Sequence, residues 1–337
     1  MKTLLHITSF LVLATLTAAA STEENIHETR AAKPGGKIVV DVNFGSIDLT
    51  PGDNDKVVVD AHRKIDASSK EKEQEYFAAA PITVTTEGDS VIVRAIRKHE
   101  SLGTQFWNLL GHNRTEARYT IRVPANFNAD LDTSGGDIST SGLTGSIKVD
   151  TSGGDLTFER IHGEIHADTS GGDIKTTGCE AKINLDTSGG QIEVTNGSGN
   201  LHADTSGGAV TVLNFAGDAK VESSGGKLRL ANVSGKLHAE TSGGAIAAIL
   251  SSPVAGDVSL ETSAGAITVV TPPNTGLTID AETGAGSVRS DLPMANVHSD
   301  DDSLKGTING GGKKLVLRSG AGAIEIISAD KETAQQQ

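Results

Sequence analysis

Hydrophobic and polar residues alternate in short runs along most of the chain, and these runs recur at a fixed spacing. The seven residues "DTSGGDI" that begin at Asp132 return almost unchanged at Asp150 and Asp168. Copies start at a constant interval at Asp132, Asp150, Asp168, Asp186, Asp204, Glu222 and Glu240, and weaker copies start at Glu261, Glu282 and Arg318. A fixed period of this kind is typical of solenoids, in which each repeat packs on its neighbours.

Each repeat predicts two short strands joined by turns. In the unit from Asp168 to Leu185, Ile174 and Thr176 alternate with polar residues, and Ile183 and Leu185 resume the alternation after a bend. Stacked parallel coils would place each inward side chain about 4.8 Å from its counterpart in the next coil. We therefore predict an all-β fold, a parallel β-solenoid with 18-residue two-strand coils.

The "SGG" segment of each copy marks the corner between the two strands. Glycine suits such a corner because it tolerates positive φ and close approach of another backbone. The threonine that precedes the corner falls on the inward side of the alternation. We expect its methyl group to pack in the core and its hydroxyl to form hydrogen bonds at the corner, at Thr133, Thr151, Thr169, Thr187 and Thr205.

The regular repeats occupy residues 132–328, and residues 36–131 form a less regular N-terminal β region. Within that region we predict a short exposed helix over residues 68–80 and an apolar loop over residues 99–116. The run "KLVLRSGAGAIEIIS" (Lys314–Ser328) repeats the strand pattern after a polar interruption. We expect this run to close the array as its last coil.

The chain begins with the pattern of a secretory signal peptide. A lysine at position 2, an apolar run over Leu4–Leu16 and three consecutive alanines predict a signal over residues 1–20 that is removed on export. The next residues, 21–35, are expected to be flexible, and residues 329–337 to form a disordered tail. The mature chain contains no second hydrophobic segment, so no transmembrane helix is predicted in it.

Composition and charge narrow the picture. Aromatic residues make up only 3% of the 337 residues while 40 are glycine, which excludes a core built from large rings and leaves a narrow aliphatic one. The formal net charge of -14 argues against nucleic acid as a partner. Because Cys179 is the only cysteine, no internal disulfide can form. We predict an exported protein of the periplasm, the cell surface or the extracellular space.

The chain resembles the bacterial DUF4097 family of adhesin-like proteins. The resemblance rests on the run "YTIRVPANFNADLDTSGGDI" from Tyr119, the repeated "TSGG" corners, and the closing "INGGGKKLVLRSGAGAIEI" from Ile308. It extends from about Gly36 to Ser328. It implies a β-solenoid of the envelope or cell surface, with an adhesin-like binding or structural role and no established catalytic residues.

Two rows of carboxylates are candidates for cation binding. Each row should face outward with its members roughly 5 Å apart, and a row of like charges should raise its own pKa values or collect cations. Calcium would be the natural guest of an all-oxygen site. Such a cation ladder would use Asp132, Asp150 and Asp168 in the first row and Asp137, Asp155 and Asp173 in the second.

The alternative to a cation site is a charge-balanced surface. Basic or neutral polar residues stand two positions before the acids, at Lys148, His166, Asn184, His202, Lys220 and His238. They would cancel much of the repulsion across neighbouring strands. The second row also ends at Gln191. We favour this interpretation and predict no cofactor and no resident metal, with calcium as the alternative.

The histidines and the cysteine offer little chemistry by spacing alone. His166, His202 and His238 are two coils apart, so neighbouring members would lie roughly 10 Å from one another, too far to share one metal ion. Cys179 has the phase of an inward residue and is expected to pack as a small apolar group.

The densest apolar cluster of the mature chain lies outside the repeats, at Phe106, Trp107, Leu109 and Leu110. It could form a docking loop for an envelope or surface protein or for a glycan. It could instead cover an end of the solenoid, where core would otherwise be open. The second interpretation is favoured, and the oligomeric state is left open.

Catalysis has no clear signature. Retaining glycosidases need two carboxyl groups about 5–5.5 Å apart, but any stacked acidic ladder meets that distance. We therefore predict no catalytic residues and a non-enzymatic, adhesin-like binding or structural module. The alternatives are a polysaccharide-cleaving β-helix enzyme and a calcium-dependent surface protein.

Overall fold

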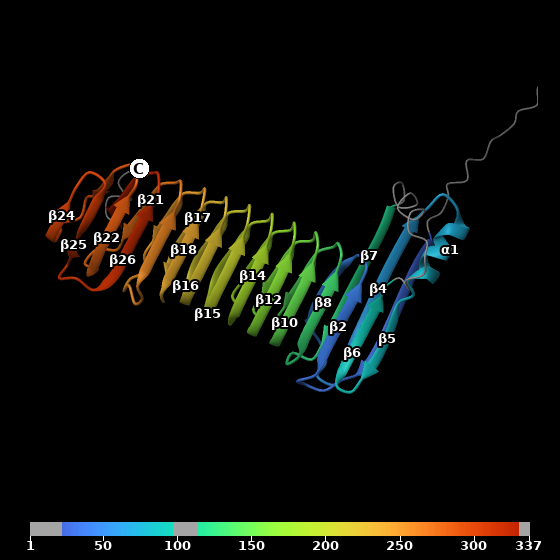
Figure 1. The fold of residues 1–337 in the computed structure, drawn as a ribbon. Helices are drawn as coiled ribbons and strands as arrows, with labels where there is room; N and C mark the ends of the chain where they lie inside the picture. Colours follow the sequence, from blue (N-terminus) through green and yellow to red (C-terminus); the bar gives the residue numbers. More distant parts are fainter. Residues whose placement is uncertain (1–21, 97–113, 330–337) are drawn as a thin grey trace, which may run out of the picture.

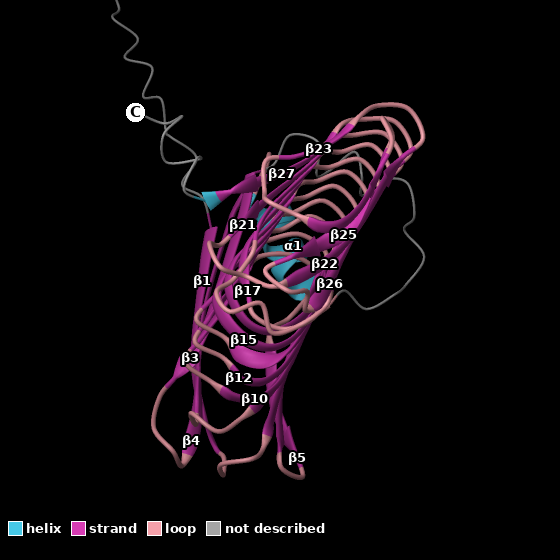
Figure 2. Ribbon diagram, turned by 90° about the vertical axis from the view of Figure 1, so that its left-hand side faces the viewer, coloured by secondary structure: helices cyan, strands magenta, loops and turns pink. Residues whose placement is uncertain are grey.

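The protein is an elongated stack of β-coils with two long sheets facing each other, as shown by a computed structural model that describes residues 22–96 and 114–329 (Figures 1 and 2). The strands of neighbouring coils pair in parallel. In the regular repeats the partners are equivalent positions of successive copies, so that Asp150 lies between Asp132 and Asp168. The predicted all-β parallel solenoid is confirmed.

We call the sheet that carries the first acidic row sheet A. Its outermost strands β5, β25 and β24 are antiparallel to their neighbours, and all other neighbours in it are parallel. In spatial order the strands are β5 (Thr83–Glu87), β6 (Ser90–Ala95), β2 (Lys37–Val42), β8 (Asn128–Thr133), β10 (Thr144–Thr151), β12 (His162–Thr169), β14 (Glu180–Thr187), β15 (Ile192–Thr205), β16 (Val210–Ser223), β18 (Leu237–Thr241), β20 (Val258–Thr262), β26 (Lys313–Ser319), β22 (Leu277–Thr283), β25 (Ser303–Ile308) and β24 (Ala295–Ser299).

Sheet B is the opposite layer, and β15 and β16 belong to both sheets because each continues through the corner between them. Only β1 and β4 run antiparallel to their neighbours here. The order is β1 (Thr22–Ala31), β4 (Lys56–Asp66), β7 (Arg114–Val123), β3 (Ser46–Pro51), β9 (Ile138–Ser141), β11 (Leu156–Glu159), β13 (Ile174–Thr177), β15, β16, β17 (Leu228–Val233), β19 (Ile246–Ile249), β21 (Ile267–Thr271), β27 (Ile324–Ser328) and β23 (Val288–Ser290).

The coil formed by β26 and β27 is not the last coil in space, so the expectation for Lys314–Ser328 was wrong. Val258 of β20 pairs with Leu315 of β26, and β26 pairs on its other edge with β22. The coil therefore lies between two coils that precede it in sequence. The reason is that β22 pairs on its outer edge with antiparallel β25, so the later coil occupies the inner edge.

The N-terminal segment also differs from expectation. Residues 21–35 were expected to be flexible, but Thr22–Ala31 forms β1, which pairs along its whole length with β4. This segment carries few apolar residues, because its sequence TEENIHETRA lies at the outer edge of sheet B and buries little. Backbone hydrogen bonds to β4, which burial patterns in the sequence do not reveal, hold it in place.

The helix expected over residues 68–80 is α1 (Lys70–Ala79), at the N-terminal end of the stack (Figure 1). Ser69 caps it by accepting a hydrogen bond from the backbone N–H of Lys72. Buried Glu73 accepts hydrogen bonds from the Thr22 hydroxyl and the Ala67 backbone N–H. Buried Arg63 donates to the Ala80 carbonyl and lies 5.1 Å from the ring centre of Phe77. The helix is thus fastened to β1 and β4.

The core is a set of aliphatic columns between the two sheets, and the corner threonines belong to it as expected. Thr187 is 1% exposed; its hydroxyl donates to the Gly172 carbonyl of the preceding coil at 3.0 Å and accepts from the Gly190 N–H at 3.2 Å. Thr169, Thr205 and Thr241 repeat this pair of bonds. At the corner the two strands end, and the threonine hydroxyls there form the hydrogen bonds that link one coil to the next.

Some predictions lie outside the described residues. These are the signal peptide over residues 1–20 and the apolar cluster of Phe106, Trp107, Leu109 and Leu110, together with all but the first residue of the predicted tail. Among the residues that are described, no helix has the length and apolar character needed to cross a membrane.

Candidate functional site

The acidic column runs along the outer surface of sheet A, one carboxylate per coil. Parallel register places each acid beside the next, from Asp132 beside Asp150 to Glu240 beside Glu261. Asp41 of β2 extends the column by one coil beyond Asp132. An arginine stands at each end of this run, because Arg94 pairs with Asp41 and Arg318 pairs with Glu261.

Partial burial and mutual repulsion raise the pKa of two acids in the column, Asp132 and Asp186. For Asp132, loss of hydration is the largest cause and the charges of Asp150 and Asp41 add to it. For Asp186, the causes are again loss of hydration and then the charges of the acids on either side. At these two positions, repulsion from the neighbouring acids adds to the effect of lost hydration.

Lys220 and His238, which stand two residues before an acid, each contact that acid. The Lys220 ammonium lies 2.6 Å from a carboxylate oxygen of Glu222, and His238 Nε2 lies 4.0 Å from an oxygen of Glu240. Further along, His166 Nδ1 and the Asn184 amide nitrogen are 2.8 Å apart. These contacts engage the acids Glu222 and Glu240, and the His166–Asn184 contact joins two neighbours within the preceding row.

The second acidic row is used to cap the backbone at the corners. Asp137 Oδ1 accepts the backbone N–H of Asp155 at 3.0 Å, and Asp155 Oδ1 accepts that of Asp173 at 2.8 Å. Asp173 Oδ1 in turn accepts the N–H of Gln191 at 2.7 Å. None of the six acids of the predicted cation ladder belongs to a group of three metal-ligating side chains within 4.8 Å, over the ranges that the structure describes.

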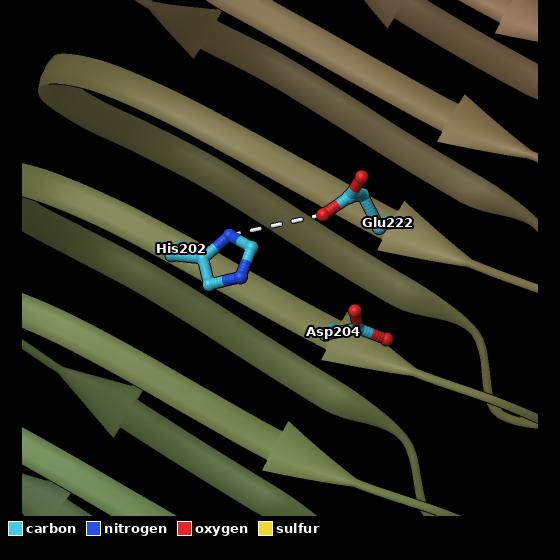
Figure 3. Close-up of side chains that lie close together, drawn as sticks. All are labelled: His202, Asp204 and Glu222. Atoms are coloured by element: carbon cyan, nitrogen blue, oxygen red, sulfur yellow. Dashed lines mark ion pairs between the residues drawn. The ribbon is translucent and has the colours of Figure 1, made fainter.

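The side chains that do converge are His202, Asp204 and Glu222 (Figure 3). His202 and Asp204 are two residues apart on β15 and therefore share its outer face, while Glu222 on β16 is the register partner of Asp204. One ligand atom from each lies within 4.8 Å of the other two. We call these three residues the His202 cluster.

One nitrogen of the cluster is poorly satisfied. His202 Nδ1 is buried, lies 4.0 Å from Glu222 Oε2, and has no hydrogen-bond partner in the described part of the chain. The ring itself is half-buried, with 40% of the side chain exposed. The cluster is therefore partly shielded yet accessible from solvent, and it offers one nitrogen and two carboxylates to a cation.

The spacing of the histidines relative to one another does not reveal this cluster. The combination of a histidine with the acid of its own coil and the acid of the next coil was the available signal. Cys179, by contrast, lies where it was expected: it is buried in the core, and burial raises the pKa of its thiol.

A shallow groove of about 470 Å³ crosses sheet A beside the cluster. It runs across consecutive coils from β15 to β26, between two rows of outward side chains. The floor of the groove is formed around the inward residues Leu201, Ala219, Leu237 and Val258. One rim carries Asn200, Asp218, Lys236, Asp257 and Lys314. The other rim carries Lys220, His238, Ser259 and Val316. Asp218 Oδ1 accepts a hydrogen bond from the backbone N–H of Lys236, and Asp257 Oδ1 accepts one from the backbone N–H of Lys314. One oxygen of each carboxylate is therefore already hydrogen-bonded.

Comparison with solved structures finds similar chains at low sequence identity. The chain is similar to solved structures of a proposed adhesin from Bacteroides fragilis NCTC 9343 (15% identity, 90% of this chain and 97% of that one, TM-score 0.39) and of a proposed cell adhesion protein from Clostridium sporogenes ATCC 15579 (14%, 90% and 100%, TM-score 0.19). A proposed lipid-binding protein from Parabacteroides distasonis ATCC 8503 is similar at 10% identity, with 90% and 96% covered and a TM-score of 0.27. At these scores the similarities carry no functional argument. No curated protein matches the chain.

A family model provides the firmer relationship. The model described as Toastrack DUF4097 matches residues 36–216 and again residues 183–327. Together the two matches include the N-terminal β region, every regular coil and the coil formed by β26 and β27. The chain therefore belongs to the Toastrack DUF4097 family.

Proposed function

We propose that the protein is an exported, non-enzymatic binding module of the cell envelope or cell surface, and that it holds its partner in the groove of sheet A. The observation that carries the proposal is the course of the groove. It crosses five successive strands of sheet A, so a linear ligand meets a side chain of each rim about every 4.8 Å. Repeated weak contacts of this kind favour an extended polymer such as a glycan strand or a segment of a surface protein.

The chemistry of the groove supports binding rather than catalysis. Its floor is backbone and aliphatic carbon, and its rims hold residues of the coil ladders. Lys220, Lys236 and Lys314 line the groove together with Asp218 and Asp257, so its rims offer ammonium groups in a chain whose net charge is -14. An anionic or hydroxyl-rich polymer suits such rims, because ammonium groups donate hydrogen bonds to carboxylate, phosphate and hydroxyl oxygens.

A capture experiment with matched variants tests the groove. The mature chain from residue 21 is immobilised and exposed to native envelope fractions, and the captured glycan or protein is identified by sugar analysis and mass spectrometry. Lys236→Glu combined with Lys314→Glu should abolish capture, because both changes reverse charge on one rim.

Arg229→Glu is the matched control, since Arg229 is exposed on β17 in the opposite sheet. Capture by this variant should equal that of the unchanged chain. Equal capture by all three proteins would contradict the proposed groove, and so would the absence of any specific capture.

Export has its own test. Cleavage after residue 20 would leave all of β1 (Thr22–Ala31) in the mature protein, so it would remove no described strand. Intact-mass measurement of protein from fractionated cells should find a chain that begins at residue 21 in the envelope or medium. An uncleaved chain confined to the cytoplasm would contradict the proposal.

A further inference from the structure

His202 belongs to a column of outward side chains that stand two residues before the acids, one in each coil. Its neighbours in this column show why the His202 cluster differs from the equivalent positions of other coils. At the same position two coils earlier, His166 has its Nδ1 engaged at 2.8 Å by the amide of Asn184. The residue that follows His202 in this column is Lys220, which turns instead to Glu222. His202 Nδ1 is consequently left without a hydrogen-bond partner among the described residues.

An unpaired buried nitrogen carries a cost that a bound cation would remove. A buried polar group without a hydrogen-bond partner destabilises the folded state. Glu222 Oε2, at 4.0 Å from His202 Nδ1, is too far for a hydrogen bond. Two ligands of one metal ion can, however, lie that far apart, because each ligand atom is about 2.0–2.2 Å from the ion.

The donor set indicates the class of ion. One imidazole nitrogen with two carboxylates suits zinc and related divalent transition metals, whereas calcium takes six to eight oxygen ligands. Two of the three donors come from one strand and the third from its parallel neighbour, so the backbone ladder fixes their spacing. The outer side faces solvent, which leaves positions for water.

We propose that His202, Asp204 and Glu222 bind a divalent transition-metal ion of the zinc class. The Lys220 ammonium, 2.6 Å from Glu222, competes with the ion for the same carboxylate. Half of the Lys220 side chain is exposed, so the ammonium can turn toward solvent when the ion binds. The site is therefore weakened by a residue of its own coil, and removal of that residue should strengthen it.

Calorimetric titration of the full mature chain with zinc chloride tests the proposal. The unchanged chain should bind one zinc ion saturably, and excess calcium should not displace it. His202→Gln and Glu222→Gln should each weaken binding at least tenfold, whereas Lys220→Met should strengthen it several-fold. All three positions are partly exposed on the outer face, so the variants are expected to fold.

His166→Gln is the matched control, because His166 occupies the same column but is held by Asn184. It should leave zinc affinity unchanged. Zinc should also raise the melting temperature of the unchanged chain and not that of His202→Gln, because an ion that binds only the folded state stabilises it.

Three results would overturn the site. The first is the absence of saturable zinc binding in both the unchanged chain and Lys220→Met. The second is equal weakening by His166→Gln and His202→Gln, which would indicate diffuse binding along the whole column. The third is displacement of zinc by calcium at comparable concentrations. The groove proposal survives each of these results, because its test uses different residues.

Discussion

The second glycine of each corner is required by the backbone of the neighbouring coil. A Cβ atom placed on Gly190 would lie 1.8 Å from the Gly172 carbonyl oxygen, whereas one on Gly189 would lie 3.6 Å from its closest neighbour, the Ser170 carbonyl oxygen. Neither Gly189 nor Gly190 has φ in the left-handed region. Of the two reasons that the sequence offered for the paired glycines, close approach of another backbone is therefore the one that applies here.

The two glycines of one corner should respond differently to the same change. Gly190→Ala should lower the free energy of unfolding by about 3 kcal/mol or more, because the methyl group forces two coils apart. Gly189→Ala should change it by less than about 1 kcal/mol, since the site has room. Urea unfolding followed by circular dichroism measures both. Similar losses in the two variants would contradict the steric reason.

The acidic column should make stability depend on pH in a defined direction. The pKa of Asp132 is raised by loss of hydration and then by Asp150 and Asp41; Lys148 lowers it, and Asp130 adds a smaller upward effect. A carboxyl group with a raised pKa binds more protons folded than unfolded, so its contribution to stability falls as pH rises from about 3.9 through the folded pKa. Above that window the cost is fully present.

Asp132→Asn should therefore stabilise the protein at pH 7, by less than about 1 kcal/mol because solvent screens a largely exposed group. The advantage should shrink as pH falls through the same window, and also with added salt at neutral pH. Thermal unfolding at a series of pH values measures it. A gain that grows at acidic pH would show that the raised pKa of Asp132 is not its origin.

At the scale of elements, the regular alternation of polar and apolar residues predicts the repeats. It does not predict the elements whose order depends on hydrogen bonds to distant parts of the chain. The corner threonines and the core phase of Cys179 follow from a period of two within the longer period of the coil. The strand β1 does not follow, since TEENIHETRA has one large apolar residue, Ile26, and its order comes from pairing with β4. Glu73 is another example: a charged residue in a helix gave no sign of burial, which depends on Thr22 and Ala67.

Strand β26 brings a positive charge into the acidic column. Its position places Arg318 between Glu261 and Glu282 in register. The guanidinium lies 3.1 Å from a carboxylate oxygen of Asp280 and also donates to the Asp280 carbonyl at 2.8 Å. Burial would raise the pKa of Asp280, but Arg318 together with Lys305 holds it below its ordinary value. This arginine ties β22 to β26.

Arg318→Glu should destabilise the C-terminal coils by about 1–2 kcal/mol, since it replaces an ion pair by a run of adjacent acids. Arg318→Lys should cost less, because the charge is retained while the paired donors are lost. Hydrogen exchange of residues 277–283 should report the loss locally. Equal exchange in Arg318→Glu and the unchanged chain would mean that the ion pairs contribute nothing to the docking of β22.

At the scale of the whole molecule, the order of coils could not be deduced from the repeat. Between Asp132 and Glu240 each coil simply follows the last, and the period fixes its neighbours. Beyond that point the constant interval is lost, because Leu237 pairs with Val258 and Val258 pairs with the much later Leu315. The His202 cluster was hidden for a related reason, since its members come from two coils and no single motif contains them.

Removal of residues 313–337 tests the role of the inserted coil. In a stack where coils contact only their neighbours, the loss should not reach distant coils such as those of β10 to β16. Strand β22 loses its parallel partner β26, and β20 and β21 lose the coil that covers them. Residues 258–308 should therefore lose hydrogen-exchange protection, while residues 144–223 keep theirs.

Removal of residues 330–337 alone is the matched control and should change neither region. If β22 keeps the protection of the N–H groups on its β26 edge in the longer truncation, those groups must have gained another partner strand, and strand order at this end would not depend on the inserted coil. The exposed edge of β20 makes a second outcome measurable. An uncovered parallel edge is a template for another chain, so the truncated protein should self-associate at concentrations where the full mature chain does not.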